Sequence, residues 1–395
     1  MIESIASAEH RLGMPAEQFL RDYWQRKPLL IRGAFANLSC PITPEDLAGL
    51  ACEEFALSRI VIHDAKRDRW TLENGPFEES RFASLPKRDW TLLVQDVDKW
   101  DVDVGTVLDA FAFLPSWRID DIMVSYAVDG GSVGAHVDQY DVFLLQAQGK
   151  RRWRIDSKAD PSTEFRDDTE LRLLREFNLD YDWLLEPGDM LYLPPGVPHH
   201  GVAEGDCLTF SIGMRAPAVS ELIVDFAESL AEDLAEEVRY RDAGIGVASE
   251  AGEIDASALA RVREALTTLS DLDDASLAAW FPRFITRYRA ANTPAPRPKP
   301  LTAAQWQRDR ESGSNLQRNP WARLAWVAHD DGATLYVCGE AFPCTAAIAR
   351  QLCDRQAVSA IDIAKLNLQD ANLVLELINA GMLGLQKPRA SRSRR

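Results

Sequence analysis

The stretch Gly134-Ala135-His136-Val137-Asp138-Gln139-Tyr140-Asp141 decides how the rest of this sequence is interpreted. In a β-strand, residues i and i+2 point to the same face, so His136 and Asp138 are predicted to share a face. Together with a distant histidine, this pair supplies two imidazoles and one carboxylate. That ligand set is typical of a non-haem Fe(II) site with open coordination positions. A His-x-Asp pair is common by chance, so the prediction depends on a second stretch.

The second stretch is Glu186-Pro187-Gly188-Asp189-Met190-Leu191-Tyr192-Leu193-Pro194-Pro195-Gly196-Val197-Pro198-His199-His200. A tight turn at Pro187–Asp189 precedes a short apolar strand, which Pro194-Pro195-Gly196 ends before His199 opens the next strand. This order resembles the second metal-binding half of cupin barrels, in particular the JmjC-type oxygenases. The family pattern Pro-Pro-Gly-x-Pro-His selects His199 as the third ligand. His200 is predicted to face the other way, at the surface or behind the ligands.

Strand alternation also indicates a cosubstrate anchor in Gly149–Ile155, a predicted strand after a glycine turn. Arg151 shares the face of Trp153 and Ile155, whereas the other three cations lie on the opposite, solvated face: Lys150, Arg152 and Arg154. A buried arginine requires a partner, and its planar fork matches a carboxylate. The distal carboxylate of 2-oxoglutarate would satisfy it; an internal Asp or Glu is the alternative.

Two further strands carry small polar residues on one face and large apolar residues on the other. Thr209 and Ser211 alternate with Leu208, Phe210 and Ile212, and Ser125 lies in the similar stretch Ile122–Ala127. In a barrel, such faces would line a ligand-filled lumen, which makes Ser125, Thr209 and Ser211 candidate cosubstrate contacts. A solvent-exposed strand face is equally compatible with each strand alone.

Composition limits the class of protein. The 395 residues, 46% of them hydrophobic and 27% charged, predict more than one globular domain. The sequence has no signal-peptide pattern and no long uncharged apolar run, so we expect a cytoplasmic protein without membrane association. Six scattered cysteines indicate neither a disulfide framework nor a zinc ribbon. The net charge of −17 favours basic partners over nucleic acid, although solubility alone would also explain it.

The chain is predicted to have five parts. Residues 1–217 are predicted to form the metal-binding domain, and residues 218–290 a helical region. This region carries an apolar stripe of Leu222, Phe226, Leu230 and Leu234. The stripe suggests a homodimer contact, with packing against the barrel of the same chain as the alternative. Gly244–Gly252 is predicted as an interhelical loop. Residues 291–301 form a Pro-rich linker, residues 302–386 a winged-helix-like domain, and residues 387–395 a basic tail.

Within residues 302–386 the predicted strands are Arg323–Val327 and Thr334–Val337, and the predicted helices are Thr345–Cys353, Ser359–Leu366 and Leu368–Leu385. The last helix carries Asp370 and Glu376 and no basic residue before Lys387. Direct DNA binding is therefore not expected.

Residues of roughly 14–390 resemble the bacterial ribosomal oxygenases of the JmjC/cupin type, as four motifs show: residues 130–141, Gly-Lys-Arg-Arg-Trp-Arg, Pro-Pro-Gly-x-Pro-His, and residues 211–217. The resemblance implies an α+β fold, with a double-stranded β-helix (jelly-roll) barrel followed by helices and a winged helix. It implies an enzyme that uses Fe(II), 2-oxoglutarate and O2 to hydroxylate the β-carbon of an arginine in large-subunit ribosomal protein sixteen. By that resemblance His136, Asp138 and His199 hold the iron and Arg151 anchors 2-oxoglutarate. Thr209 stands where relatives carry asparagine.

An arginine substrate requires an acid near the iron. Asp129, in the turn Val128–Gly131, is the candidate, with an ordinary turn aspartate as the alternative; Asp141 is the weaker choice. Tyr140 shares the predicted ligand face and would line the substrate channel. Two other functions are kept open: a non-catalytic, metal-binding regulator, and a hydroxylase or demethylase of another basic residue.

Overall fold

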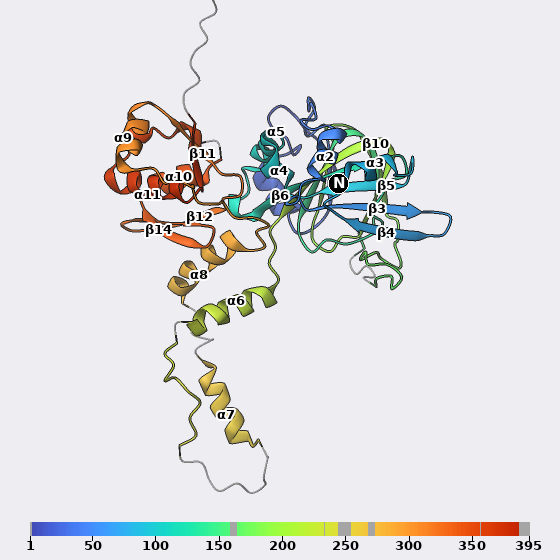
Figure 1. The fold of residues 1–395 in the computed structure, drawn as a ribbon. Helices are drawn as coiled ribbons and strands as arrows, with labels where there is room; N and C mark the ends of the chain where they lie inside the picture. The colour runs from blue at the N-terminus through green and yellow to red at the C-terminus, as the bar shows by residue number, and fades with distance from the viewer. Residues whose placement is uncertain are drawn as a thin grey trace, which may run out of the picture. The chain divides into compact units, whose positions relative to one another are not determined.

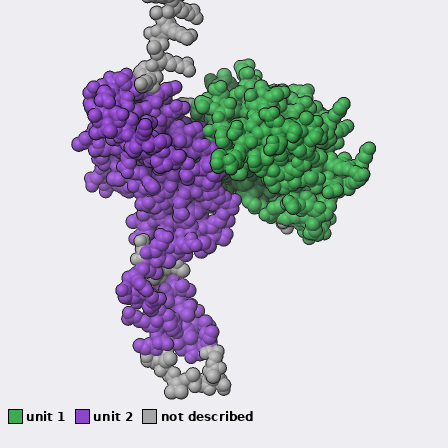
Figure 2. Space-filling model, in the orientation of Figure 1, with its two compact units in different colours: residues 1–216 green, residues 217–395 purple. Residues whose placement is uncertain are grey.

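The chain is described from a computed structural model, which covers residues 2–158, 164–232, 234–243, 254–267, 273–355 and 357–386. It divides into two compact units, Met1–Ala216 and Pro217–Arg395 (Figure 2). The predicted loop Gly244–Gly252 and the predicted tail 387–395 lie outside the described residues.

The first unit is built on one ten-stranded sheet (Figure 1). Its strands are β1 (Glu3–Ile5), β2 (Leu29–Arg32), β3 (Ser58–Asp64), β4 (Arg69–Asn74), β5 (Trp90–Val94), β6 (Ile119–Ala127), β7 (Val142–Ile155), β8 (Tyr181–Leu185), β9 (Met190–Leu193) and β10 (His199–Met214). Their spatial order is β1-β2-β9-β7-β10-β6-β5-β3-β4, with β8 paired to β7. The described pairings form an open path rather than a closed ring. The sheet is antiparallel except for the parallel pair β1–β2, and it corresponds to the jelly-roll predicted from the sequence.

Each face of the sheet has its own apolar cluster, because side chains alternate along the strands. One face packs under the helical elements of the unit: α1 (Ala16–Asp22), α2 (Pro44–Leu50), α3 (Glu79–Ala83), α4 (Val97–Trp100), α5 (Val102–Gly105) and the 3-10 turns Thr106–Phe111 and Ser116–Arg118. The opposite, inner face buries a smaller cluster: Leu30, Val142, Leu144, Trp153, Ile155, Leu185, Leu191 and Leu193. Trp153 and Ile155, which were predicted to share a face with Arg151, therefore lie on the inner face.

The two longest strands, β7 and β10, pair along most of their length and bend together. The sequence predicted a glycine turn at Gly149 before the strand begins. In the structure Gly149 instead lies inside β7, with φ of +65°. A Cβ at this position would lie 2.1 Å from the Asp206 carbonyl oxygen, so only glycine fits this bend. Opposite it, the register of β10 shifts between Glu204 and Leu208.

The second unit contains the predicted helical region and winged helix. Its elements are α6 (Val219–Glu232), α7 (Ala256–Ala265), α8 (Asp274–Arg287), α9 (Ala303–Glu311), β11 (Asn315–Arg318), β12 (Leu324–His329), β13 (Gly332–Val337), β14 (Glu340–Cys344), α10 (Ala346–Cys353), 3-10 turns at Val358–Ala360 and Ile363–Lys365, α11 (Leu368–Asn379) and β15 (Leu383–Gln386). Strands β12-β13-β14 form one sheet, and β11 pairs with β15 in another. Among the described residues, no helix is long and apolar enough to cross a membrane.

Two predicted helices in this unit require correction. The last helix ends at Asn379, because Gly381 adopts φ of +78° and β15 follows. The predicted helix Ser359–Leu366 consists of short 3-10 turns, and α9, β11 and β14 were not predicted. Of the two acids noted on this helix, Asp370 is buried and accepts a hydrogen bond from the Thr345 hydroxyl at 2.8 Å.

Candidate metal and cosubstrate site

The segment that carries His136 and Asp138 is an irregular connection between β6 and β7, not the predicted strand. It is held against the start of β10 by paired backbone hydrogen bonds, from His136 N to His199 O at 3.0 Å and from His199 N to His136 O at 2.9 Å. The Pro-Pro-Gly turn adds a third bond, because Gly196 N donates to Asp138 O at 2.7 Å. Backbone pairing, rather than strand alternation, thus brings the ligand candidates together.

His136, Asp138 and His199 form a compact triad, with one ligand atom of each lying within 4.8 Å of the others. In both histidines Nδ1 lies close to the carbonyl oxygen two residues earlier, at 3.0 Å from Gly134 O and 2.9 Å from Val197 O. A carbonyl can only accept, so Nδ1 carries the proton and Nε2 presents a lone pair. Burial lowers the pKa of His199 to about 4, which keeps this imidazole neutral.

This donor set fits a divalent transition metal. Two imidazoles oriented by backbone carbonyls, plus one carboxylate, match the composition of a non-haem Fe(II) site. Asp138 Oδ2 lies 3.7 Å from His199 Nε2, a spacing that leaves the two atoms free to share an ion rather than a hydrogen bond. His200 is not part of the triad; its ring packs edge-on against Phe177 with centroids 6.1 Å apart.

Arg151 lies on the inner face of β7 and is only 2% exposed. Its guanidinium makes two long hydrogen bonds, from Nη1 to Ser125 Oγ at 3.4 Å and from Nη2 to Gly201 O at 3.3 Å. Nε has no partner, and no carboxylate among the described residues pairs with this cation. Burial lowers the pKa of Arg151, as expected for a desolvated cation without a counter-charge. The internal Asp or Glu alternative is therefore not realised among these residues.

Polar side chains line the sheet beside Arg151. Thr209 and Ser125 face each other across the β10–β6 pair, and both are buried. The Thr209 hydroxyl donates to Gln146 Oε1 at 3.1 Å, which adds a buried amide that the sequence analysis did not identify. Ser211 lies farther along the same face of β10, opposite Met123, and is half-buried. The structure thus places Arg151, Ser125 and Thr209 together and leaves Ser211 at the edge of the group.

Two other residues of the site were missed. A Cβ on Gly201 would lie 2.7 Å from Arg151 Nε, so this glycine makes room for the guanidinium. Asp121 continues the alternation of Met123 and Ser125 on β6, a signal that was available in the sequence. Its Oδ1 lies 3.4 Å from the Cβ position of Gly213, and Tyr140 Cε2 lies 3.9 Å from that position. Burial raises the pKa of Asp121 to about 7, against the opposing effect of Lys99.

The predicted substrate contacts separate in the structure. Tyr140 is 40% exposed and lies beside Asp138; partial burial, followed by the charge of Asp138, raises the pKa of the phenol. Asp129 instead accepts from Gly205 N at 3.0 Å and pairs with Arg88 at 3.1 Å, as an ordinary turn aspartate would. Asp141 is fully buried and forms an ion pair with Arg118. Neither acid presents a free carboxylate beside the triad.

Comparison with known proteins gives matches over both units. Residues 106–222 match the JmjC domain family model, and residues 254–384 match the ROXA-like winged helix model. The chain is 34% identical over 332 residues to the Escherichia coli ribosomal protein uL16 3-hydroxylase, covering 84% of this chain and 86% of that protein. It is 45% identical over 208 residues to a probable ribosomal oxygenase of Haemophilus influenzae, covering 52% of this chain and 51% of that protein. The solved structure of YcfD, a ribosomal oxygenase from Escherichia coli, in complex with cobalt and 2-oxoglutarate matches with a TM-score of 0.77 at 31% identity, covering 95% of this chain and 99% of that one.

Proposed function

The chain belongs to the JmjC-domain ribosomal oxygenases, and we propose that it hydroxylates the β-carbon of an arginine in a large-subunit ribosomal protein, using Fe(II), 2-oxoglutarate and O2. The observation that carries the proposal is the buried Arg151, a cation without a carboxylate partner among the described residues, on β7, which pairs with the strand that begins at His199. A dicarboxylate cosubstrate supplies the missing charge. A metal site without such an anchor would favour the non-catalytic alternative.

The proposed roles follow from the geometry. His136, Asp138 and His199 would hold Fe(II), which with 2-oxoglutarate and O2 supplies the oxidising chemistry. Arg151 would orient the distal carboxylate of the cosubstrate, with Ser125 and Thr209 as neighbouring hydroxyls and Ser211 at the edge. The buried apolar cluster that includes Trp153 excludes water from this face. The net charge of −17 suits a basic protein substrate.

The direct test is incubation of the purified protein with ribosomal proteins, Fe(II) and 2-oxoglutarate, followed by mass spectrometry. We expect a single added oxygen on an arginine of a large-subunit protein. The His136→Ala variant is the matched control and should leave the proteins unmodified. Succinate production without any oxidised ribosomal protein would contradict the proposed substrate, whereas oxidation of another basic residue would favour the alternative hydroxylase.

We propose that Asp121 binds the substrate guanidinium through Oδ1, in place of Asp129. This oxygen and the Tyr140 ring both approach a Cβ built on Gly213, whereas Asp121 Oδ2 accepts a hydrogen bond from Asp96 N at 3.0 Å. Asp121→Asn should reduce use of an arginine peptide by about tenfold or more, the scale of a charged hydrogen bond. Turnover of 2-oxoglutarate without peptide should remain largely unchanged. Asp129→Asn is the control and should behave as wild type in both assays. Loss of peptide use in Asp129→Asn alone would return the role to Asp129.

We also propose a homodimer through the helical region. Helix α6 has no buried residue, and Phe226 packs edge-on against Trp280 of α8, with ring centroids 5.0 Å apart. Val219, Ile223 and Val224 remain 70%, 62% and 56% exposed, an apolar surface that a second copy would cover. Sedimentation should show a dimer at micromolar concentration. Ile223→Asp should shift it to monomer, and Glu228→Gln should not; a monomeric wild type would refute the proposal.

A further inference from the structure

One loop of the first unit reaches back to the metal-ligand segment. Residues 164–175, called the strap here, form a narrow loop closed by backbone bonds from Arg166 N to Leu173 O and from Arg175 N to Glu164 O, both 2.8 Å. From the strap, Leu174 N donates to Ala135 O at 2.8 Å. Ala135 directly precedes His136, so the strap is hydrogen-bonded to the chain one residue before a proposed metal ligand.

The strap and the β3–β4 hairpin both contact Gly134. A Cβ built on Gly134 would lie 2.5 Å from Leu173 Cδ2 of the strap and 3.3 Å from Cη2 of Trp70, which belongs to β4. The Trp70 ring is itself stacked on His63 of β3, with centroids 4.0 Å apart and planes 12° apart. Gly134 has φ of +81°, a conformation that other residues rarely adopt. Two separate elements therefore fix the backbone two residues before His136.

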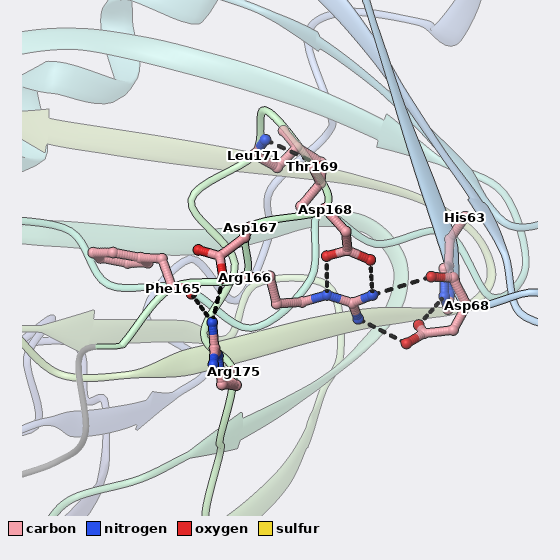
Figure 3. A network of polar contacts seen from close by, with 9 residues as sticks. All are labelled: His63, Asp68, Phe165, Arg166, Asp167, Asp168, Thr169, Leu171 and Arg175. Atoms are coloured by element: carbon pink, nitrogen blue, oxygen red, sulfur yellow. Dashed lines mark hydrogen bonds and ion pairs between the residues drawn. The ribbon is translucent and has the colours of Figure 1, made fainter.

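Arg166 joins these two elements (Figure 3). Its guanidinium binds both carboxylate oxygens of Asp168 within the strap, at 2.9 and 2.7 Å. It also donates to Asp68 of the β3–β4 turn, at 2.8 Å to Oδ2 and 3.2 Å to the carbonyl oxygen. The other Asp68 oxygen lies 3.3 Å from His63 Nε2. Figure 3 shows Arg166 between the two aspartates, with His63 behind Asp68.

We propose that Arg166 is a positioning residue for the metal site: it ties the strap to the β3–β4 turn, so that Leu173 and Trp70 together hold Gly134 and the ligands that follow it. The proposal rests on the proposed iron site. It explains why an arginine whose three guanidinium nitrogens are all hydrogen-bonded occurs in a loop. It also predicts that loss of Arg166 weakens the metal site locally and has little effect on the overall stability of the fold. The Asp68 side chain is 65% exposed, and exposed ion pairs add little to overall stability.

The test measures metal binding and local opening rather than activity alone. Arg166→Ala should raise the dissociation constant for Co(II) by about tenfold, the scale of losses when groups that orient metal ligands are removed. In the metal-free protein, amide hydrogen exchange of residues 132–138 should become faster. Asp68→Asn should act in the same direction, and Arg166→Lys should lie between wild type and alanine, because lysine keeps the charge but not the fork.

Arg175→Ala is the matched control. Arg175 lies in the same strap and forms a comparable ion pair with Asp167 at 2.7 Å, but the hydrogen bonds described for its side chain stay within the strap, with Asp167 and the Phe165 carbonyl oxygen as partners. Its Co(II) affinity and exchange should equal those of wild type. If Arg166→Ala lowers only the unfolding temperature, or matches Arg175→Ala in Co(II) affinity, the positioning role is refuted. If Arg166→Ala does not fold, unchanged Co(II) affinity in Asp68→Asn refutes it.

His136→Ala distinguishes failure of this inference from failure of the iron site. Loss of Co(II) binding in His136→Ala, with wild-type binding in Arg166→Ala, would reject the positioning role and keep the site. Undiminished Co(II) binding in His136→Ala would reject the site and the positioning role together.

Discussion

Replacing His136 or Asp138 with alanine is expected to reduce 2-oxoglutarate turnover by more than about a hundredfold, since loss of a ligand should exceed the 10–100-fold effects of the groups around it. The fold should survive, because the paired bonds between residues 136 and 199 come from the backbone and Gly196 bonds a backbone carbonyl. The measurements are succinate release with Fe(II) present, Co(II) titration and thermal unfolding. Treatment of the wild type with a chelator should reproduce the loss, and added Fe(II) should restore activity.

The neighbouring histidine provides the control for this experiment. His200 follows His199 in the sequence but packs against Phe177 outside the triad. His200→Ala should retain Co(II) binding. Full iron-dependent activity in His136→Ala or Asp138→Ala, or loss of Co(II) binding in His200→Ala alone, would show that the ligands are wrongly assigned.

Replacing Arg151 with alanine is expected to raise the 2-oxoglutarate concentration required for half-maximal turnover by about ten- to a hundredfold, from the roughly 1.5–3 kcal/mol of a charged hydrogen bond. Arg151→Lys should recover only part of this, because one ammonium cannot reproduce the bidentate fork. Arg152→Ala is the control, since Arg152 lies on the opposite face in ion pairs with Asp182 and Glu204. If Arg151→Ala requires the same 2-oxoglutarate concentration as the wild type, Arg151 is not the anchor of the cosubstrate.

Loss of Arg151 should weaken cosubstrate binding, but it should not weaken the stability of the ligand-free protein. Without cosubstrate, Arg151 is a desolvated cation whose Nε has no partner, so it should destabilise the folded protein. Arg151→Met should therefore unfold at the same temperature as the wild type or higher in the absence of 2-oxoglutarate. Addition of 2-oxoglutarate and Co(II) should stabilise the wild type more than the variant, which thermal unfolding can measure. A large loss of stability in the ligand-free variant would indicate a structural role instead.

Sequence patterns were sufficient where strand alternation alone sets the geometry. The assignment of Arg151 to the apolar face of its strand is correct, because a period of two fixes the side of every residue within an unbroken strand. The short strand Met190–Leu193 and the start of the next strand at His199 were also predicted, because Pro-Pro-Gly leaves few alternatives for the chain. The same alternation on β6 places Asp121 on the face of Met123 and Ser125, so Asp121 could also have been predicted.

Only the tertiary structure decided features that depend on contacts distant in sequence. His136 and Asp138 meet His199 through backbone bonds to β10, not through a common strand, and no local pattern encodes such a bridge. Asp129 was predicted as a substrate contact, but Gly205 and Arg88, both remote from it in the chain, bind its carboxylate. The chemistry of the donor set was determined by residue types and spacing. Which carboxylates remain free, and which loops hold the ligands, was determined by packing, because a side chain's available partners exist only in the folded chain.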